Sequence, residues 1–386
     1  MFMENHAKTL DESSEIYEKL RTLLSPDAPG FVKLPQHPLT NLLLENLYSP
    51  KEAALMVAIF NHTWEEVTLA QASARSRKTL EELQALLLDM AVKGKVQSGE
   101  NGEVFISAYM PGIFEYYFVA AKDDPEKMSN VARAHYGLMG MAFNPGLKLP
   151  INFPHDFDPQ SRWRFIPAIE PTLRTIKINE VLESKPEILP FEVVARLLEK
   201  YDIFAVAPCA CRTMAKMSGN PCKRTHENFC ALAGASAEKL IKAGFGRQVD
   251  FDEMMTLMKK AETEGLVHST QNFEEPASYI CNCCSCCCGH LKIIKDFRYK
   301  GRAAFSNFTP VIDHEKCTRC GTCETICPME VVSFREEDSQ SLIHMDLEFC
   351  IGCGICASNC PEDAIDLKKT RNNKPIQAPR KHGFFG

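Results

Sequence analysis

Cysteine is the residue type with which this 386-residue sequence can do chemistry. All 18 cysteines follow position 208 and fall into three groups, so the first half of the chain contains none. In a reducing cytosol, thiols grouped at short spacings favour metal or cluster ligation over disulfides. Neighbouring thiols, such as Cys283 with Cys284, would also be prone to oxidation unless something binds them. The sequence therefore predicts a protein that carries metal or iron–sulfur groups.

The last of the three groups is an internal duplication. Residues 313–334 and 346–367, offset by 33 positions, are identical at 8 of 22 positions without gaps. Each copy contains the run Cys-x2-Cys-x2-Cys-x3-Cys-Pro, whose fourth cysteine ligates the other cluster in proteins with two 4Fe–4S clusters. By this rule the ligands of one cluster are Cys317, Cys320, Cys323 and Cys360, and those of the other are Cys327, Cys350, Cys353 and Cys356.

Zinc is the alternative for this segment, but zinc sites usually combine Cys-x2-Cys pairs and do not explain two copies of a fourth cysteine followed by proline. At every ligand position, residues 310–368 resemble the bacterial dicluster ferredoxin family. The resemblance implies a small fold of duplicated βαβ type and one-electron chemistry at two adjacent clusters. Gly321 and Gly354 suit a close approach of the backbone to a cluster.

Ten cysteines lie outside this duplication, in two groups with other spacings. They are Cys209, Cys211, Cys222, Cys230, Cys281, Cys283, Cys284, Cys286, Cys287 and Cys288. Ten thiols are enough for two further four-cysteine sites, with two left over. Three interpretations remain open: one or two additional Fe–S clusters, structural zinc with His226 or His290 as a further ligand, or a redox-active thiol array. Cys287-Cys288-Gly289 resembles the Cys-Cys-Gly motif of heterodisulfide-reductase-type clusters, but in a single copy.

The N-terminal part contains no cysteine and reads as mainly helical. We expect an N-terminal helix over residues 11–24 and, after a connector, helices over residues 49–60, 67–74 and 79–93, with Ser49 and Glu52 as a capping box. A β-ribbon is expected around the turn at residues 99–102. The order of the last three helices and the ribbon resembles a winged helix, which would usually imply DNA binding. Residues 41–110 contain nine acidic and six basic residues, which favours a protein partner over nucleic acid.

The central part is expected to be mainly helical as well. Asp250 and Glu253 indicate a capping box at the start of a helix, and Gly265 indicates its end. We expect this helix to bring the two central cysteine groups together, as a hairpin would. The predicted fold class is α+β. The predicted segments are an N-terminal helix and linker (1–35), a winged-helix-like domain (36–120), a cysteine-rich helical domain (121–300), a dicluster ferredoxin domain (301–368) and a basic tail (369–386).

Composition excludes several functional classes. No apolar run approaches the roughly 20 residues of a membrane helix, and the first residues are polar and acidic, which predicts a cytoplasmic protein, with peripheral docking to a membrane complex left open. Neither a Rossmann glycine pattern nor a P-loop occurs, so no nucleotide cofactor is supported. Residues 301–367 contain 12 acidic and 4 basic residues, whereas residues 368–386 contain six basic and no acidic ones. That tail is either a docking segment or a solvated end.

The arrangement of a winged-helix-like part, two central cysteine groups and a terminal ferredoxin segment resembles a poorly characterised group of iron–sulfur proteins of anaerobic microbes. The resemblance implies an electron carrier, or the electron-transfer subunit of an oxidoreductase complex, with a redox protein as partner. Two alternatives stay open. One is a redox-sensing DNA-binding regulator, and the other is a reductase with an unusual active-site cluster at the central cysteines.

Overall fold

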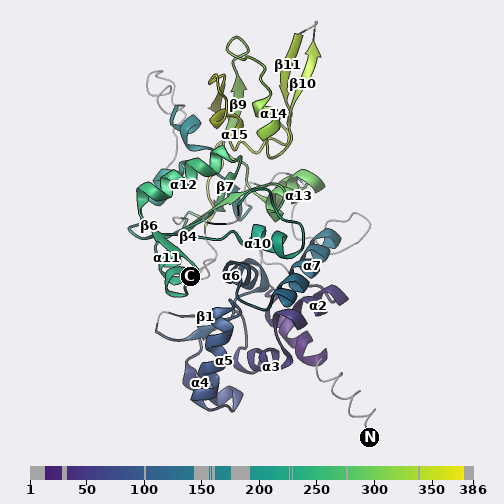
Figure 1. Ribbon diagram of the computed structural model, residues 1–386, viewed down its shortest axis with the longest axis vertical. Helices are drawn as coiled ribbons and strands as arrows, with labels where there is room; N and C mark the ends of the chain where they lie inside the picture. The colour runs from purple at the N-terminus through teal and green to yellow at the C-terminus, as the bar shows by residue number, and fades with distance from the viewer. Residues whose placement is uncertain are drawn as a thin grey trace. The chain divides into compact units, whose positions relative to one another are not determined.

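Helices and strands are both present, in agreement with the predicted α+β class (Figure 1). The structure is a computed structural model. It describes residues 14–27, 33–99, 101–142, 156, 158, 161–174, 192–225, 227, 229–274, 277–337 and 340–377. The chain divides into two units. Unit 1 contains the N-terminal 152 residues and the segment Ala210–Lys223, and unit 2 contains Phe153–Cys209 and Arg224–Lys381. Among the described residues, no helix is long and apolar enough to cross a membrane.

Unit 1 is built mainly from helices that pack around buried leucine, isoleucine and aromatic side chains. Its first described helix covers residues 14–23. The others are α2 (Pro38–Leu47), α3 (Pro50–Ile59), α4 (Leu69–Ser76), α5 (Leu80–Val92), α6 (Phe114–Ala120), α7 (Pro125–Ala142) and α10 (Ala210–Met217). An irregular turn at Tyr109–Ile113 precedes α6. Helix α10 packs against α6 and α7, so the chain returns to unit 1 after its first central cysteines.

Local capping explains where the helices of unit 1 begin. The Ser49 and Glu52 capping box forms as predicted, with Pro50 in the first turn of α3. Thr79 and Glu82 form the same motif at the start of α5. Beyond α5, the short strands β1 (Gln97–Ser98) and β2 (Val104–Phe105) pair antiparallel on either side of the predicted turn. Three helices followed by a two-stranded ribbon is therefore the observed element order.

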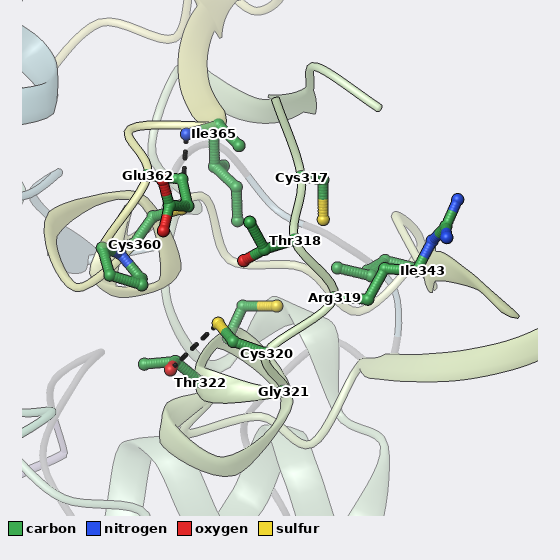
Figure 2. Close-up of a pocket in the computed structure, with 13 residues that line it drawn as sticks. Cys317, Thr318, Arg319, Cys320, Gly321, Thr322, Ile343, Cys360, Glu362 and Ile365 are labelled. Atoms are coloured by element: carbon green, nitrogen blue, oxygen red, sulfur yellow. Dashed lines mark hydrogen bonds between the residues drawn. The ribbon is translucent and has the colours of Figure 1, made fainter. Parts of the chain in front are cut away.

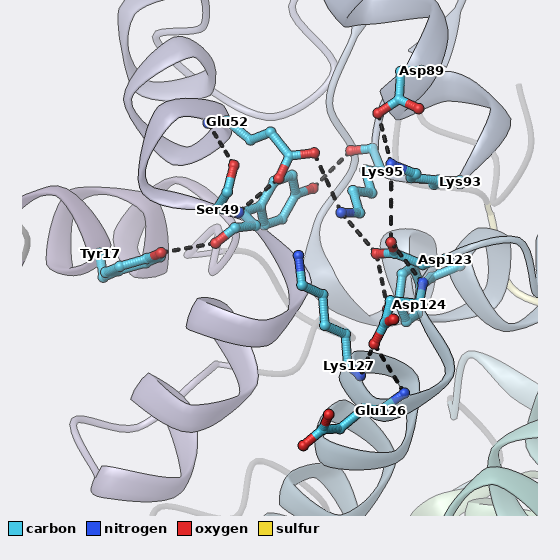
Figure 3. Close-up of polar contacts among 12 residues, drawn as sticks. Tyr17, Ser49, Glu52, Asp89, Lys93, Lys95, Asp123, Asp124, Glu126 and Lys127 are labelled. Atoms are coloured by element: carbon cyan, nitrogen blue, oxygen red, sulfur yellow. Dashed lines mark hydrogen bonds and ion pairs between the residues drawn. The ribbon is translucent and has the colours of Figure 1, made fainter.

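A buried ion pair connects the end of α5 with the segment that follows α6 (Figure 3). Lys95 Nζ lies 2.8 Å from Asp123 Oδ2, and these side chains are only 1% and 4% exposed. Glu52 Oε1 is the second carboxylate partner, at 3.3 Å. Burial by itself would raise the pKa of Asp123, but the hydrogen bond and charge of Lys95 outweigh burial and hold the pKa below its ordinary value. Asp123 is therefore charged at neutral pH.

Unit 2 is centred on a six-stranded antiparallel sheet with the strand order β3-β7-β8-β5-β4-β6. Its strands are β3 (Trp163–Phe165), β4 (Phe204–Ala207), β5 (Cys230–Ala233), β6 (Arg247–Val249), β7 (Val267–Gln271) and β8 (Tyr279–Cys283). Its helices are one over residues 169–174 and α9 (Val194–Leu198), α11 (Ala235–Lys242), α12 (Phe251–Thr263) and α13 (Gly289–Phe297), with a short 3-10 turn at Lys300–Arg302. The central region thus contains more strand than the sequence predicted.

The two faces of this sheet belong to different apolar cores. Phe204, Val206 and Ile280 join one core together with Met254 and Met258 of α12. The other core contains Val267 and Cys283 together with α13 and much of the ferredoxin-like segment, including Cys323, Ile351 and Ile355. Because successive strand residues point to opposite faces, β8 contributes Ile280 to the first core and Cys283 to the second. The cysteine-bearing face is therefore the one covered by the C-terminal segment.

The C-terminal segment repeats the order strand, helix, strand. Its elements are β9 (Phe308–Ile312), α14 (Thr322–Ile326), β10 (Val332–Glu337), β11 (Gln340–Met345), α15 (Ile355–Ser358) and β12 (Ile365–Lys369). Strand β12 pairs antiparallel with β9, and β10 with β11 (Figure 1). Gly321 and Gly354 have φ of 80° and 70°, left-handed values that favour glycine, at the start of the two helices. The duplicated βαβ fold implied by the resemblance is thus present.

A buried polar network links the sheet to the last cysteine loop. Glu262, 2% exposed, accepts hydrogen bonds from Ile169 N (2.8 Å) and Ser358 Oγ (2.7 Å), and its Oε1 lies 3.0 Å from His268 Nε2. His268 Nδ1 in turn lies 2.7 Å from Asn282 Oδ1 on β8. Burial would raise the pKa of Glu262, but its hydrogen bonds and the His268 interaction hold the pKa below its ordinary value. One carboxylate therefore fixes β7, β8 and the loop before Cys360.

Two details differ from the sequence-based expectations. At Asp250 only half of the predicted capping box forms, because the Glu253 side chain binds Arg247 instead of the backbone of Asp250. The start of the predicted basic tail is also not purely solvated. Lys369 Nζ lies 2.8 Å from the buried Glu192 Oε2, and Arg371 Nη1 donates to Ser306 O. Lys369 and Arg371 thus make contacts within unit 2. Residues 378–386 lie outside the described residues.

The ion pair of unit 1 predicts a large effect of Asp123→Ala. Removing one partner leaves a buried ammonium group short of a counter-charge, so we expect the free energy of unfolding to fall by about 3 kcal/mol, the lower end of the usual range because Glu52 remains. The chain contains two tryptophans, Trp64 in unit 1 and Trp163 in unit 2. Fluorescence of Trp64 in a Trp163→Phe background therefore reports the unfolding of unit 1.

Asp89→Ala is the matched control, because Asp89 is 58% exposed and pairs with the partly exposed Lys93. It should cost less than about 1 kcal/mol. The stabilisation from Asp123 should be present at neutral pH and disappear as the pH falls through its lowered folded pKa, since the unfolded chain binds the proton more tightly. Equal effects of the two alanine variants would contradict this account.

The network around Glu262 predicts a corresponding effect in unit 2. Glu262→Ala leaves His268, Ser358 and a backbone N–H without their buried acceptor, which should destabilise unit 2 by about 3–5 kcal/mol. Glu253→Ala on the same helix is the control, because Glu253 is 43% exposed and its ion pair with Arg247 contributes about 0–1 kcal/mol. Fluorescence of Trp163 in a Trp64→Phe background measures both. An unchanged free energy of unfolding in Glu262→Ala would show that the network does not stabilise unit 2.

Candidate metal centres

The four predicted ligands of the first cluster line one small cavity (Figure 2). Three of them, Cys317, Cys320 and Cys323, come from the first repeat and the N-terminal end of α14. The fourth, Cys360, follows α15 in the second repeat. Antiparallel pairing of β9 with β12 brings the two repeats together here. The cavity therefore joins the residues that the crossed-ligand rule assigns to one cubane.

Hydrogen bonds to sulfur come from residues that the cysteine spacing does not reveal. Thr322 Oγ1 lies 3.3 Å from Cys320 Sγ, and Ala364 N donates to Cys360 Sγ at 3.3 Å (Figure 2). The Thr322 interaction holds the pKa of the exposed Cys320 thiol below its ordinary value. Donors of this kind stabilise thiolate charge and tune the potential of a bound cluster. In the sequence, only the position of Thr322 two residues after Cys320 could have indicated that it interacts with the sulfur atom.

The second predicted set surrounds a more enclosed place. The charges of Cys327, Cys350 and Cys353 interact with one another and with Cys356. Burial raises the pKa of the Cys350, Cys353 and Cys356 thiols, and the neighbouring cysteines add to that rise. Thiols with raised pKa values lose their protons only when a cation compensates the charge, as a metal or cluster does. The residues present thus fit a bound 4Fe–4S group.

The central cysteines form two further arrangements in unit 2. Cys284, Cys286 and Cys287, in the loop between β8 and α13, have Sγ atoms within 4.8 Å of one another. Cys230 on β5 lies opposite Cys281 on β8 in the strand register. The two central cysteine groups therefore meet as the sequence predicted, although paired strands rather than a helical hairpin join them. Cys288 directly precedes the first residue of α13.

The remaining sequence candidates lie elsewhere. Cys209 follows β4, Cys211 lies in α10, and Cys222 lies in the loop after α10. His226 is outside the described residues. His290 stacks on Trp163, with ring centroids 4.3 Å apart, and burial together with the charge of Arg302 holds its pKa well below the ordinary value. The sulfur group at Cys284 contains no histidine among the described residues.

Comparison with known proteins assigns the C-terminal segment. Residues 309–374 match the family described as 4Fe–4S dicluster domain. No curated protein and no solved structure gives a significant match to the chain. The matched residues contain both repeats and the cavity that joins them. The chain therefore carries a C-terminal 4Fe–4S ferredoxin-like domain, and it is an iron–sulfur protein of the electron-transfer kind.

Proposed function

We propose that this protein relays electrons between a redox partner and a set of iron–sulfur centres that extends beyond the ferredoxin-like domain. The observation on which the proposal rests is the cavity that unites Cys360 of the second repeat with three cysteines of the first. When bound there and at the second set, 4Fe–4S groups supply one-electron redox chemistry. The protein orients the thiolates, shields them from water and provides donors to sulfur. It is a carrier or an electron-transfer subunit in this proposal.

The two ferredoxin sites differ in their access to solvent, which suggests a direction for the relay. Cys320 is exposed, whereas Cys350, Cys353 and Cys356 are partly buried among residues of unit 2. Electron transfer to a partner requires a short distance, so the exchange surface lies at the Cys320 side. Residues 301–367 are strongly acidic, with 12 acidic and 4 basic residues. A redox protein with a basic docking face fits this surface.

The thiols at Cys284 supply a further centre in this proposal. A single tetrahedral ion with metal–sulfur bonds of about 2.3 Å holds its thiolates about 3.8 Å apart. Cys286 Sγ and Cys287 Sγ are 3.7 Å apart, and the group stays within 4.8 Å. A cubane spreads its thiolates over four irons and needs a wider set. One iron or zinc ion therefore suits this group better than a cubane.

The three thiolates come from one loop, and no histidine joins them among the described residues. A site of this kind, rich in sulfur, is one that iron and zinc both accept.

Helix α5 favours a protein partner for unit 1. In a winged helix this helix would read DNA, yet Leu80, Leu88 and Val92 are 54%, 64% and 41% exposed. Glu81 and Glu82 lie in its first turn. The acidic side chains repel the phosphate backbone of a nucleic acid. The exposed apolar side chains suit contact with another protein. The regulator hypothesis therefore receives no support from this helix, and we assign unit 1 to docking.

The crossed-ligand assignment predicts a non-additive loss of iron. Cys320→Ala and Cys360→Ala should each remove one cluster, about four iron atoms per chain, because both belong to the same cubane. The double variant Cys320→Ala/Cys360→Ala should lose no more than either single one. Cys320→Ala/Cys356→Ala should lose about eight, since these residues serve different clusters. Iron and acid-labile sulfide on anaerobically purified full-length protein give the numbers.

Cys209→Ala is the control, because Cys209 belongs to neither repeat. It should retain all ferredoxin iron and the electron paramagnetic resonance signal of the reduced protein. Additive loss in Cys320→Ala/Cys360→Ala would refute the assignment. Full iron content in all variants, or zinc in place of iron at the repeats, would refute the electron-transfer proposal itself.

A further inference from the structure

Three cysteines of unit 2 share one face of the sheet. Cys281 and Cys283 are two residues apart on β8, so their side chains point to the same side. Cys230 on β5 is the register partner of Cys281, and residues directly opposite each other in paired strands also point to the same side. Val267 and Ser269 of β7 lie beside them in the same register. The sheet thus presents three thiols side by side.

A fourth thiol comes from the start of α13. The loop after β8 turns back on itself, and Cys288 N donates to Cys284 O at 3.0 Å. This turn brings Cys288 close to Cys283. Cys281 in turn is a neighbour of both Cys283 and Cys230. The four thiols therefore form a continuous row from β5 across β8 to the helix.

The row lies in a largely apolar environment. Cys283 and Cys288 are 8% and 3% exposed, among Val267 and Leu291. The Ser269 hydroxyl lies 3.3 Å from Cys283 Sγ and is a polar neighbour of the row.

We propose that Cys230, Cys281, Cys283 and Cys288 form a second central metal centre, a [2Fe–2S] group. In this arrangement Cys230 and Cys281 hold one iron, and Cys283 and Cys288 hold the other. The shape of the row supports two irons over one, because the thiols are close in successive pairs, whereas a single ion needs a compact set such as the one at Cys284. Four thiolates, two to each iron, are the ligand set of a [2Fe–2S] cluster.

This assignment explains the unusual density of cysteines between residues 281 and 288. Ligands of the two centres alternate along the loop: Cys281 and Cys283 serve the row, the next three cysteines serve the compact group, and Cys288 serves the row again. Adjacent residues such as Cys287 and Cys288 thus belong to different centres that lie back to back.

The row shares an apolar core with the ferredoxin-like domain. Cys283 and Cys288 pack in the same cluster as Cys323, Ile351 and Ile355. A redox centre at this place would continue the relay inward from the partly buried cluster set. This role rests on the proposed function, whereas the metal centre itself does not.

The test compares metal content among variants of the full-length chain purified without oxygen. We expect Cys281→Ala to lose about two irons and two sulfides per chain relative to the wild type. Cys230→Ala/Cys281→Ala should lose no more than the single variant. The control Cys286→Ala should keep these two irons and two sulfides, because Cys286 belongs to the other centre, and Cys209→Ala should keep all metal. Retention of the reduced ferredoxin signal shows that each variant is folded.

Unchanged iron and sulfide in Cys281→Ala would overturn the proposal, as would loss of zinc alone or a Cys230–Cys281 disulfide in the anaerobic wild type. Mössbauer spectroscopy of iron-57-enriched wild type needs no variant. It should show a diamagnetic all-ferric component of about two irons beside the 4Fe–4S signals, and its absence would also refute the centre. The iron content of the Cys320 and Cys360 variants tests the ferredoxin clusters separately. Refutation of the [2Fe–2S] centre would therefore be distinct from refutation of the electron-transfer proposal.

Discussion

The antiparallel pairing of β5 with β8 is the constraint on which the cysteine-rich part of this protein depends. Cys230 and Cys281 are 51 residues apart in the sequence, and only the ladder between these strands makes them direct neighbours. The same pairing divides the sheet into two faces. One face joins the core with α12, and the other carries thiols into the core shared with the ferredoxin-like domain. A slip of the register by one residue would turn the thiols of β8 to the wrong face.

The duplicated segment is symmetric in sequence but not in its surroundings. Both repeats place a glycine with positive φ before a short helix, and Cys360 of the second repeat lines the same cavity as three cysteines of the first. The first set includes the exposed Cys320, whereas the second lies against the segment that follows β3, where Ala168 N donates to Cys353 O. Glu262 adds an asymmetric support, because its hydrogen bond from Ser358 fixes only the loop before Cys360. The two cysteine sets thus have the same ligand chemistry, but one reaches the surface and the other lies further inside unit 2.

Short-range features of the fold were accessible from the sequence. Ser49 and Glu52 predicted the start of α3, because a capping box involves residues only three positions apart. Where a distant residue competes, such reasoning is wrong, as at Glu253, whose carboxylate binds Arg247. The strands of unit 2 were missed because several are only three to five residues long and are stabilised by neighbours far along the chain. Lys369 was read as part of a tail for the same reason, since its partner Glu192 is 177 positions away.

The sequence by itself determined the kind of chemistry. Eight cysteines at cubane spacing, followed each time by proline, specify the ferredoxin-like domain, since three of the four ligands of a cluster lie within seven residues of one another. Tertiary structure alone decided which of the other cysteines are neighbours. Cys230 lies opposite Cys281 in the paired strands β5 and β8, and Cys284, Cys286 and Cys287 gather in the loop before α13. Spacing along the chain does not encode such grouping, because strand register and side-chain direction determine which sulfur atoms meet.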